Sequence, residues 1–145
     1  MTDHAEPDHR AYLERSLGAH AAYTLHYHLV WSVKARHRVL TGPVATALRA
    51  DLLRTADSIG VTILALHVEP EHVQLLVSLR PDITLATVVG RMKGASARRL
   101  RESFPSVRAV DERACWSNGY FARTLGDITI AQAKAYLDRQ REHHE

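Results

Sequence analysis

Four short stretches of the chain are rich in β-branched and aromatic residues and alternate apolar with polar positions, which is typical of half-buried strands. We predict strands over residues 22–33, 61–68, 72–79 and 120–125. Pro70 separates the second and third strands and predicts a tight turn over residues 69–71. In the third strand, Val73, Leu75 and Val77 should face a core, while His72, Gln74 and Leu76 share the opposite face.

Apolar residues recur at helical spacing between these strands. A first helix should run from Thr41, as its cap, to about residue 58, with Pro43 in its first turn and Gly60 after its end. A second helix is predicted over residues 84–103, with Val88, Met92 and Leu100 on its apolar side. Residues 105–119 read as irregular, and a final helix should run from residue 129 to about 141, capped by Thr129 or Asp127.

The resulting order is strand, helix, strand, strand, helix, strand, helix. This βαββαβ order predicts an α+β ferredoxin-like sandwich: an antiparallel-rich sheet with helices on one face, plus a C-terminal helix. We expect residues 22–145 to form a single domain. Residues 1–21 lack a sustained apolar period and are expected to be an arm, either mobile or containing a short helix.

The composition narrows the class of protein. The 145 residues, 46% hydrophobic and 24% charged, are ordinary for one globular domain. No apolar run approaches the roughly 18 residues of a membrane span, and the polar N-terminus is unlike a signal peptide. The single cysteine, Cys115, excludes an internal disulfide and a multi-cysteine zinc site, so we expect a cytoplasmic protein. The formal charge of +3 permits a nucleic-acid partner without requiring one.

The third strand carries the first candidate for chemistry. His72 and Gln74 lie two residues apart on one face, so an imidazole and an amide could converge on one metal ion or one phosphate. The plainer interpretation is a satisfied polar side chain at the end of a strand. The residues that lie opposite His72 and Gln74 in the fold decide between the two interpretations.

The final helix carries the second candidate. Gln132, Tyr136, Gln140 and His143 form one stripe of that helix. The stripe could simply face solvent. Alternatively, Tyr136 is a nucleophile and Gln140, one turn later, reaches the same metal. A phenol is largely protonated at neutral pH, so such a nucleophile needs a metal-activated electrophile or a nearby cation.

Basic residues form the third candidate. One group follows the first strand, and another lies on the second helix without an acidic residue between its members. These residues could bind a phosphate backbone or form a solvated surface. They are Lys34, Arg36 and Arg38 in the first group, and Arg91, Lys93, Arg98 and Arg101 on the helix.

Taken together, the segments resemble a known family over roughly residues 22–140. The chain is similar to the small single-tyrosine HUH transposases of bacterial insertion sequences, of the TnpA type. The resemblance depends on five segments in the family's order and spacing, none of them sufficient alone. They are residues 27–31 (YHLVW), 70–78 (PEHVQLLVS), 89–98 (VGRMKGASAR), 116–124 (WSNGYFART) and 135–140 (AYLDRQ).

The resemblance implies a homodimer that binds single-stranded DNA hairpins at the ends of an insertion sequence. It implies that Tyr136 attacks a backbone phosphate, forming a 5′-phosphotyrosine link and a free 3′-OH. It further implies that Mg²⁺ or Mn²⁺ is held by His72, by the residue at position 74 and by Gln140. In this family, the tyrosine helix of one subunit can complete the metal site of the other.

One position departs from the family pattern. The family has two histidines separated by one hydrophobic residue, whereas this chain has His72, Val73 and Gln74. An amide oxygen suits Mg²⁺ but replaces a good nitrogen donor, so we expect weaker metal binding. Three alternatives stay open: an active DNA strand transferase, a weakened or domesticated relative that binds DNA hairpins without cutting, and a metal-free regulatory or scaffold protein.

Overall fold

The structure is a computed structural model that describes residues 25–126 and 129–144. The expected arm, the first residues of the first predicted strand and Asp127 lie outside the described residues. The elements are β1 (Leu25–Ser32), the 3-10 helix η2 (Lys34–Arg36), α2 (Gly42–Ser58), β2 (Thr62–Glu69), β3 (His72–Leu79), α3 (Leu85–Ser103), α4 (Pro105–Arg108), β4 (Phe121–Leu125) and α5 (Ile130–His144).

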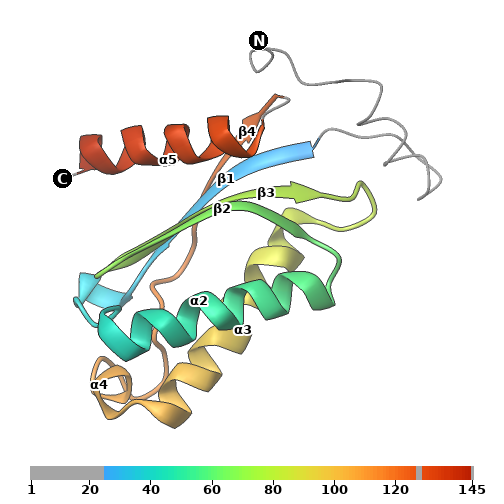
Figure 1. Cartoon of the computed structure of the whole chain (residues 1–145). Coiled ribbons are helices and arrows are strands. Elements are labelled where there is room, and N and C mark those ends of the chain that lie inside the picture. The colour runs from blue at the N-terminus through green and yellow to red at the C-terminus, as the bar shows by residue number, and fades with distance from the viewer. Residues whose placement is uncertain (1–24, 127–128, 145) are drawn as a thin grey trace.

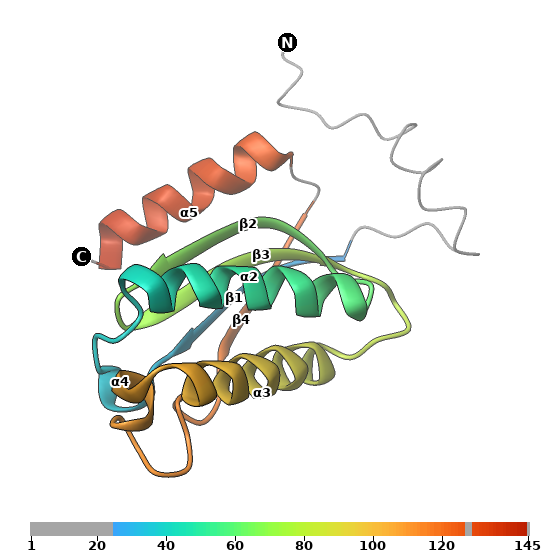
Figure 2. The same cartoon turned by 60° about the horizontal axis from the view of Figure 1, so that its bottom comes forward.

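The four strands form one antiparallel sheet in the order β2-β3-β1-β4. Helices α2 and α3 lie on one face of this sheet, and α5 lies on the other (Figure 1). A second view shows the same separation, with the sheet between α5 and the α2/α3 layer (Figure 2). The predicted α+β sandwich is confirmed, and α5 covers the face that the βαββαβ unit leaves open.

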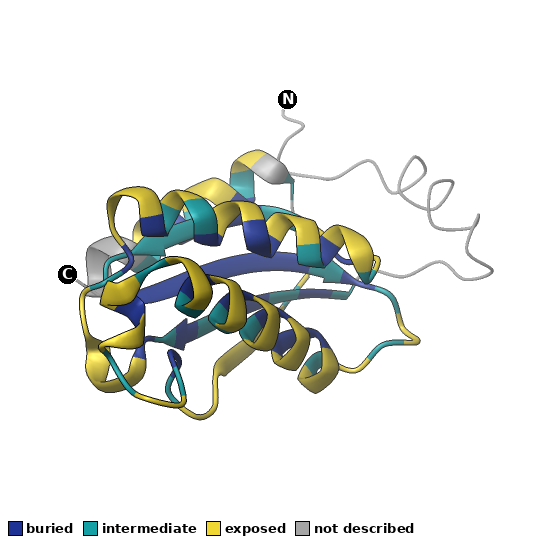
Figure 3. Ribbon diagram, turned by 90° about the horizontal axis from the view of Figure 1, so that it is seen from below, coloured by how far each residue is buried: buried dark blue, intermediate teal, exposed yellow. Residues whose placement is uncertain are grey.

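The main core fills the space between the sheet and the α2/α3 layer. Val73, Leu75 and Val77 belong to it and are fully buried, as their alternation along the strand predicts. Leu29 and Trp31 of β1 join them from the neighbouring strand. The central strands and the inward sides of α2 and α3 are accordingly among the buried parts of Figure 3.

A smaller apolar cluster attaches α5 to the opposite face. Ala133 and Leu137 of α5 pack there against Ala65 and Leu76. At the start of the helix, the Gln132 backbone N–H donates to the Thr129 hydroxyl, while the Thr129 backbone N–H donates to the Gln132 side-chain oxygen. This reciprocal pair is a capping box, which sets where α5 begins.

Two local predictions differ from the structure. Residues 105–119 are not wholly irregular, because Pro105 begins the one-turn helix α4, where its missing N–H costs no hydrogen bond. Thr41 is the N-cap of α2, yet its side chain makes no capping hydrogen bond. The side chain of Thr84 caps α3, since its hydroxyl accepts from the Thr87 backbone N–H. Within the described ranges, no helix combines the length and apolar character needed to cross a bilayer.

Candidate active site

Polar side chains collect on the sheet face that α5 covers. Strands β1 and β3 run antiparallel there, with Val30 opposite Gln74 and Ser32 opposite His72. His28, His72 and Gln74 are all buried on this face. Buried polar groups require hydrogen-bond partners, so their arrangement is informative.

The Gln74 amide lies between two imidazoles. Its oxygen Oε1 is 3.0 Å from His28 Nε2, and its nitrogen Nε2 is 3.4 Å from His72 Nε2. An amide oxygen only accepts and an amide nitrogen only donates. In this arrangement His28 therefore carries its hydrogen on Nε2, and His72 Nε2 accepts from the amide.

Tyr136 contacts the other ring nitrogen of His28. The phenolic oxygen is 3.1 Å from His28 Nδ1, and the two rings meet edge to face with centroids 5.1 Å apart. Because His28 Nδ1 is then the unprotonated nitrogen, the Tyr136 hydroxyl donates to it. Arg123 of β4 donates to the same oxygen at 3.5 Å. The nucleophile candidate is thus held between an imidazole and a guanidinium.

Two adjoining hollows open beside these residues. The larger, of about 340 Å³, is lined by His28, Val30, Phe121, Arg123, Tyr136 and Gln140. The smaller, of about 70 Å³, is lined by Val30, Ser32, Arg36 and His72. The structure therefore brings Tyr136 and Gln140 together, as the stripe along the final helix predicts, whereas His72 lies in the next hollow across Val30.

Local electrostatics favour the neutral form of His72. Burial lowers the pKa of His72, against the opposing influence of the Glu71 carboxylate. A neutral imidazole at pH 7 can act as an acceptor or metal ligand. Burial opposes ionisation of Glu71, but a backbone hydrogen bond and the positive charges of Arg38 and Arg36 hold the pKa of Glu71 below its ordinary value.

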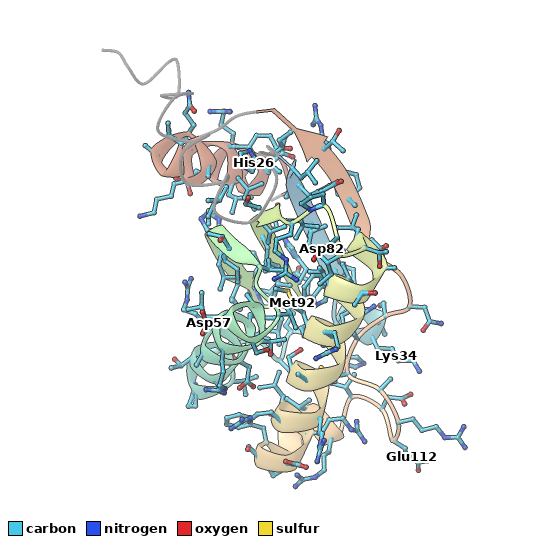
Figure 4. All side chains as sticks on the ribbon, turned by 90° about the vertical axis from the view of Figure 1, so that its right-hand side faces the viewer. His26, Lys34, Asp57, Asp82, Met92 and Glu112 are labelled. Atoms are coloured by element: carbon cyan, nitrogen blue, oxygen red, sulfur yellow. The ribbon has the colours of Figure 1, made fainter. Side chains whose placement is uncertain are left out.

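The basic residues predicted from the sequence lie in two separate places. Lys34, Arg36 and Arg38 follow β1, and Arg36 reaches the hollow beside His72. Figure 4 shows Lys34 at the opposite end of the sheet from His26, which lies under α5. Arg36 and Arg38 each pair with Glu71, at 3.6 and 3.4 Å.

The four α3 residues predicted to bind DNA lie in the helical layer on the far side of the sheet from Tyr136 (Figure 1). Arg91 and Arg98 are exposed, and Arg98 pairs with Glu102. Lys93 donates to the carbonyl oxygens of residues 117 and 119, and burial lowers the pKa of Lys93. Arg101 donates to the carbonyl oxygens of residues 111 and 112. Lys93 and Arg101 therefore hold the segment between α4 and β4 against α3.

Sequence reasoning missed two residues of this site, His28 and Arg123. They lie directly opposite each other where β1 pairs with β4. Both stand inside segments that carry the family resemblance, and His28 is on the face of its strand away from the main core. Strand alternation could therefore have flagged His28, but only the register of β1 against β3 and β4 places it between Gln74 and Tyr136.

The donor set suits a hard cation. Among the described residues, no group of three or more histidine, cysteine, aspartate or glutamate side chains could hold a metal ion. The candidates are therefore one imidazole, His72, and the amide oxygens of Gln74 and Gln140. Amide oxygens with one nitrogen donor are compatible with Mg²⁺ or Mn²⁺. The atom that lies 3.4 Å from His72 Nε2 is the Gln74 amide nitrogen, while the amide oxygen faces His28, so Gln74 would have to turn its oxygen toward His72 to share an ion with it.

Comparisons with known proteins show the family of the chain. Residues 21–140 match the family model described as "Transposase IS200 like". The chain is 36% identical over 131 residues to the ISDra2 transposase TnpA of Deinococcus radiodurans, covering 90% of this chain and 94% of the relative. It is 28% identical over 130 residues to the transposase for insertion sequence element IS200 of Salmonella typhimurium, covering 89% and 84%.

Solved structures give the same result. A crystal structure from Deinococcus radiodurans R1, assigned as a transposase, superposes with a TM-score of 0.67 at 35% identity, covering 83% of this chain and 93% of that one. A tyrosine transposase bound to a REP hairpin has a TM-score of 0.55 at 15% identity, covering 82% and 66%, and shares the fold. With the family model spanning almost the whole described domain, this chain belongs to the IS200-like transposases.

Proposed function

We propose that Tyr136 is the nucleophile with which this IS200-like transposase cleaves and rejoins single-stranded DNA. The family cleaves single-stranded DNA through a tyrosine. The observation that supports Tyr136 is its phenolic oxygen, which lies within hydrogen-bonding distance of His28 and Arg123 beside a cavity of about 340 Å³. A tyrosine held between an imidazole and a guanidinium, next to open space, can meet a phosphate.

The reaction that fits this arrangement is transesterification. The Tyr136 oxygen forms a bond to the phosphorus while the bond from phosphorus to the 3′ oxygen breaks. The phenolic proton leaves the tyrosine, and the departing 3′ oxygen takes up a proton to become a free 3′-OH. The products are a 5′-phosphotyrosine and a 3′-OH. Attack by another 3′-OH on the phosphotyrosine reverses these steps and rejoins DNA without an external energy source.

Arg123 places a positive charge beside the Tyr136 oxygen and the cavity. Its guanidinium donates to the phenolic oxygen, and it also lines the cavity where a phosphate would lie. A fixed cation favours negative charge that develops on the nucleophile and on the phosphate oxygens. Its position on β4, directly opposite His28, keeps this charge on a rigid strand.

The family is metal-dependent, and we infer that His72, Gln74 and Gln140 would hold Mg²⁺ or Mn²⁺ in this chain. When bound, the ion would polarise the scissile phosphate as a Lewis acid. His72 contributes a neutral imidazole, and Gln74 contributes an amide where the family resemblance leads us to expect a second histidine. Gln140, one helical turn after Tyr136, lines the same cavity as the nucleophile.

We infer that the substrate is single-stranded DNA with hairpin ends and that the transposase acts as a homodimer. Arg36 and Arg38 are best placed to bind the DNA backbone near the site, because Arg36 lines the hollow of His72 and both are exposed. Lys34, with Arg91 and Arg98 on α3, would extend phosphate binding away from the site. The roles of Lys93 and Arg101 are first structural, through their contacts to backbone carbonyls.

Covalent trapping tests the proposal. Wild-type protein incubated with single-stranded insertion-sequence ends and Mg²⁺ should give a protein–DNA adduct that survives a denaturing gel. Tyr136→Phe should abolish the adduct. Tyr120→Phe is the matched control, because Tyr120 is an exposed tyrosine just before β4 and should react like wild type. An adduct that persists in Tyr136→Phe contradicts the assignment, and DNA binding without any adduct supports the non-cutting relative instead.

A further inference from the structure

The hydrogen bonds that connect Tyr136 to His72 all run in one direction. The Tyr136 hydroxyl donates to His28 Nδ1, His28 Nε2–H donates to Gln74 Oε1, and Gln74 Nε2–H donates to His72 Nε2. A neutral imidazole has one donor and one acceptor nitrogen, and an amide has one donor end and one acceptor end. Neither inner group can therefore reverse one of its bonds without reversing the other.

When the hydrogen bonds run in this direction, Gln74 and His72 cannot together bind a cation. The Gln74 amide presents its nitrogen to His72, and an amide nitrogen is not a ligand for a hard cation, which takes oxygen. Half a turn of the amide about its last side-chain bond exchanges Oε1 and Nε2. The oxygen then stands beside His72 Nε2, where the nitrogen is now, 3.4 Å away. The Gln74 oxygen and His72 Nε2 would then both be available as ligands to a cation.

That half turn has a consequence at the other end. The Gln74 nitrogen now donates to His28 Nε2, so the hydrogen of His28 must be on Nδ1. His28 Nδ1–H then donates to Tyr136, and the phenolic oxygen becomes an acceptor from both His28 and Arg123. Hydrogen bonds donated to an oxygen stabilise the negative charge it carries as it becomes a nucleophile.

We propose that His28 is a positioning residue that couples cation binding at His72 and Gln74 to Tyr136, by a change of imidazole tautomer that reverses this chain of hydrogen bonds. The inference deepens the proposed function and rests on it. It also gives Gln74 a role that an imidazole could not fill in the same way, because an amide can turn its oxygen to either neighbour. Cation binding at His72 and Gln74 would then be accompanied by hydrogen bonds that stabilise negative charge on the Tyr136 oxygen.

Ring-nitrogen NMR tests the proposal directly. In ¹⁵N-histidine-labelled full-length protein at a pH where the buried imidazoles are neutral, His28 should carry its hydrogen on Nε2 without a divalent ion and on Nδ1 with saturating Mg²⁺. His26 is the matched internal control. It lies on the same face of β1, and its Nδ1 donates to the carbonyl oxygen of residue 126 at 2.9 Å, so its hydrogen should stay on Nδ1 throughout.

Gln74→Leu provides the matched variant, since an apolar side chain of similar size removes the link and keeps the site filled. The His28 tautomer should then not respond to Mg²⁺. The proposal is overturned if wild-type His28 keeps one tautomer up to Mg²⁺ saturation measured by calorimetry, if no Mg²⁺ binds, or if Gln74→Leu responds like wild type. The wild-type spectra decide the matter even if a variant fails to fold.

Cleavage kinetics separate this proposal from the proposed function. His28→Asn should lower the rate constant for adduct formation about 10–100-fold, as supporting residues commonly do, and leave the DNA concentration at half-maximal rate unchanged. A rise in the DNA concentration at half-maximal rate by the same factor as the fall in the rate constant would contradict a positioning role. An adduct through Tyr136 with no tautomer change would contradict the coupling and support Tyr136 as the nucleophile. A tautomer change with no adduct would support the coupling and contradict the assignment of Tyr136 as the nucleophile.

Discussion

Substitution of Leu137 by alanine should release α5 from the sheet without unfolding the main core. The helix packs against β2 and β3 through a small cluster in which Leu137 is fully buried and Ala133, Ala65 and Leu76 are its buried neighbours. The change removes about three methylene equivalents at about 0.8 kcal/mol each. With the cavity left behind, the expected cost is about 3 kcal/mol.

The loss of packing free energy should appear as local opening of α5. The main core between the sheet and the α2/α3 layer does not include Leu137, so most of its apolar contacts stay intact when α5 leaves. A loss of about 3 kcal/mol corresponds to about a 100-fold shift toward the undocked helix. Tyr136 and Gln140 are carried by this helix, so undocking separates the nucleophile from His28.

Native-state hydrogen exchange and adduct formation check this reasoning. Backbone amides of α5 should exchange about 100-fold faster in Leu137→Ala, while amides of β3 change much less. Leu48→Ala is the matched control, because Leu48 is equally buried but lies in the main core under α2. It should lower global stability and accelerate exchange throughout the sheet. Equal acceleration of β3 and α5 in Leu137→Ala, or acceleration of neither, would contradict local opening of α5.

Two further predictions concern charged groups away from the site. Asp51, buried on α2, pairs with Arg99 of α3 at 3.3 Å, so Asp51→Ala should lower the free energy of unfolding by about 2 kcal/mol; the exposed Asp57 of the same helix is the control, and equal urea midpoints for the two variants would contradict this. The hydrogen bond from Lys34 lowers the pKa of Asp111 to about 2 from an ordinary value of 3.8. Because the folded pKa is the lower one, this contribution to stability is present above pH 3.8 and lost as the pH falls toward 2. Lys34→Met should raise the pKa of Asp111 in a carboxyl NMR titration, and an unchanged value would show that the lysine is not its cause.

Local patterns predicted the strands and helices well because each has a strong period. The third strand was predicted at its observed bounds, since Pro70 and the break after Leu79 delimit an unbroken alternation. Helix α4 was not predicted, because one turn is too short to establish a period of 3.6 residues. The stripe on the final helix correctly grouped Tyr136 with Gln140, because residues four apart on a helix share a face whatever surrounds them.

Gln132 shows the limit of the same reasoning. It falls on the stripe of Tyr136 and Gln140, but its side chain caps the start of α5 through Thr129. The stripe also includes His143, whose side chain lies outside what the structure describes. A shared face therefore identified candidates without saying which of them reach the site. The capping alternative was visible in the spacing of Thr129 and Gln132, three residues apart before an apolar run.

By itself, the sequence determined the α+β order of elements, the inward faces of the strands, and the family to which this transposase belongs. These depend on periodicity and on segments read along the chain. The position of His28 between Gln74 and Tyr136 was decided only by the tertiary structure, as was that of Arg123 opposite His28. The physical reason is register: side chains on three strands and a helix meet at one point only after the sheet has paired, and no local pattern encodes that alignment.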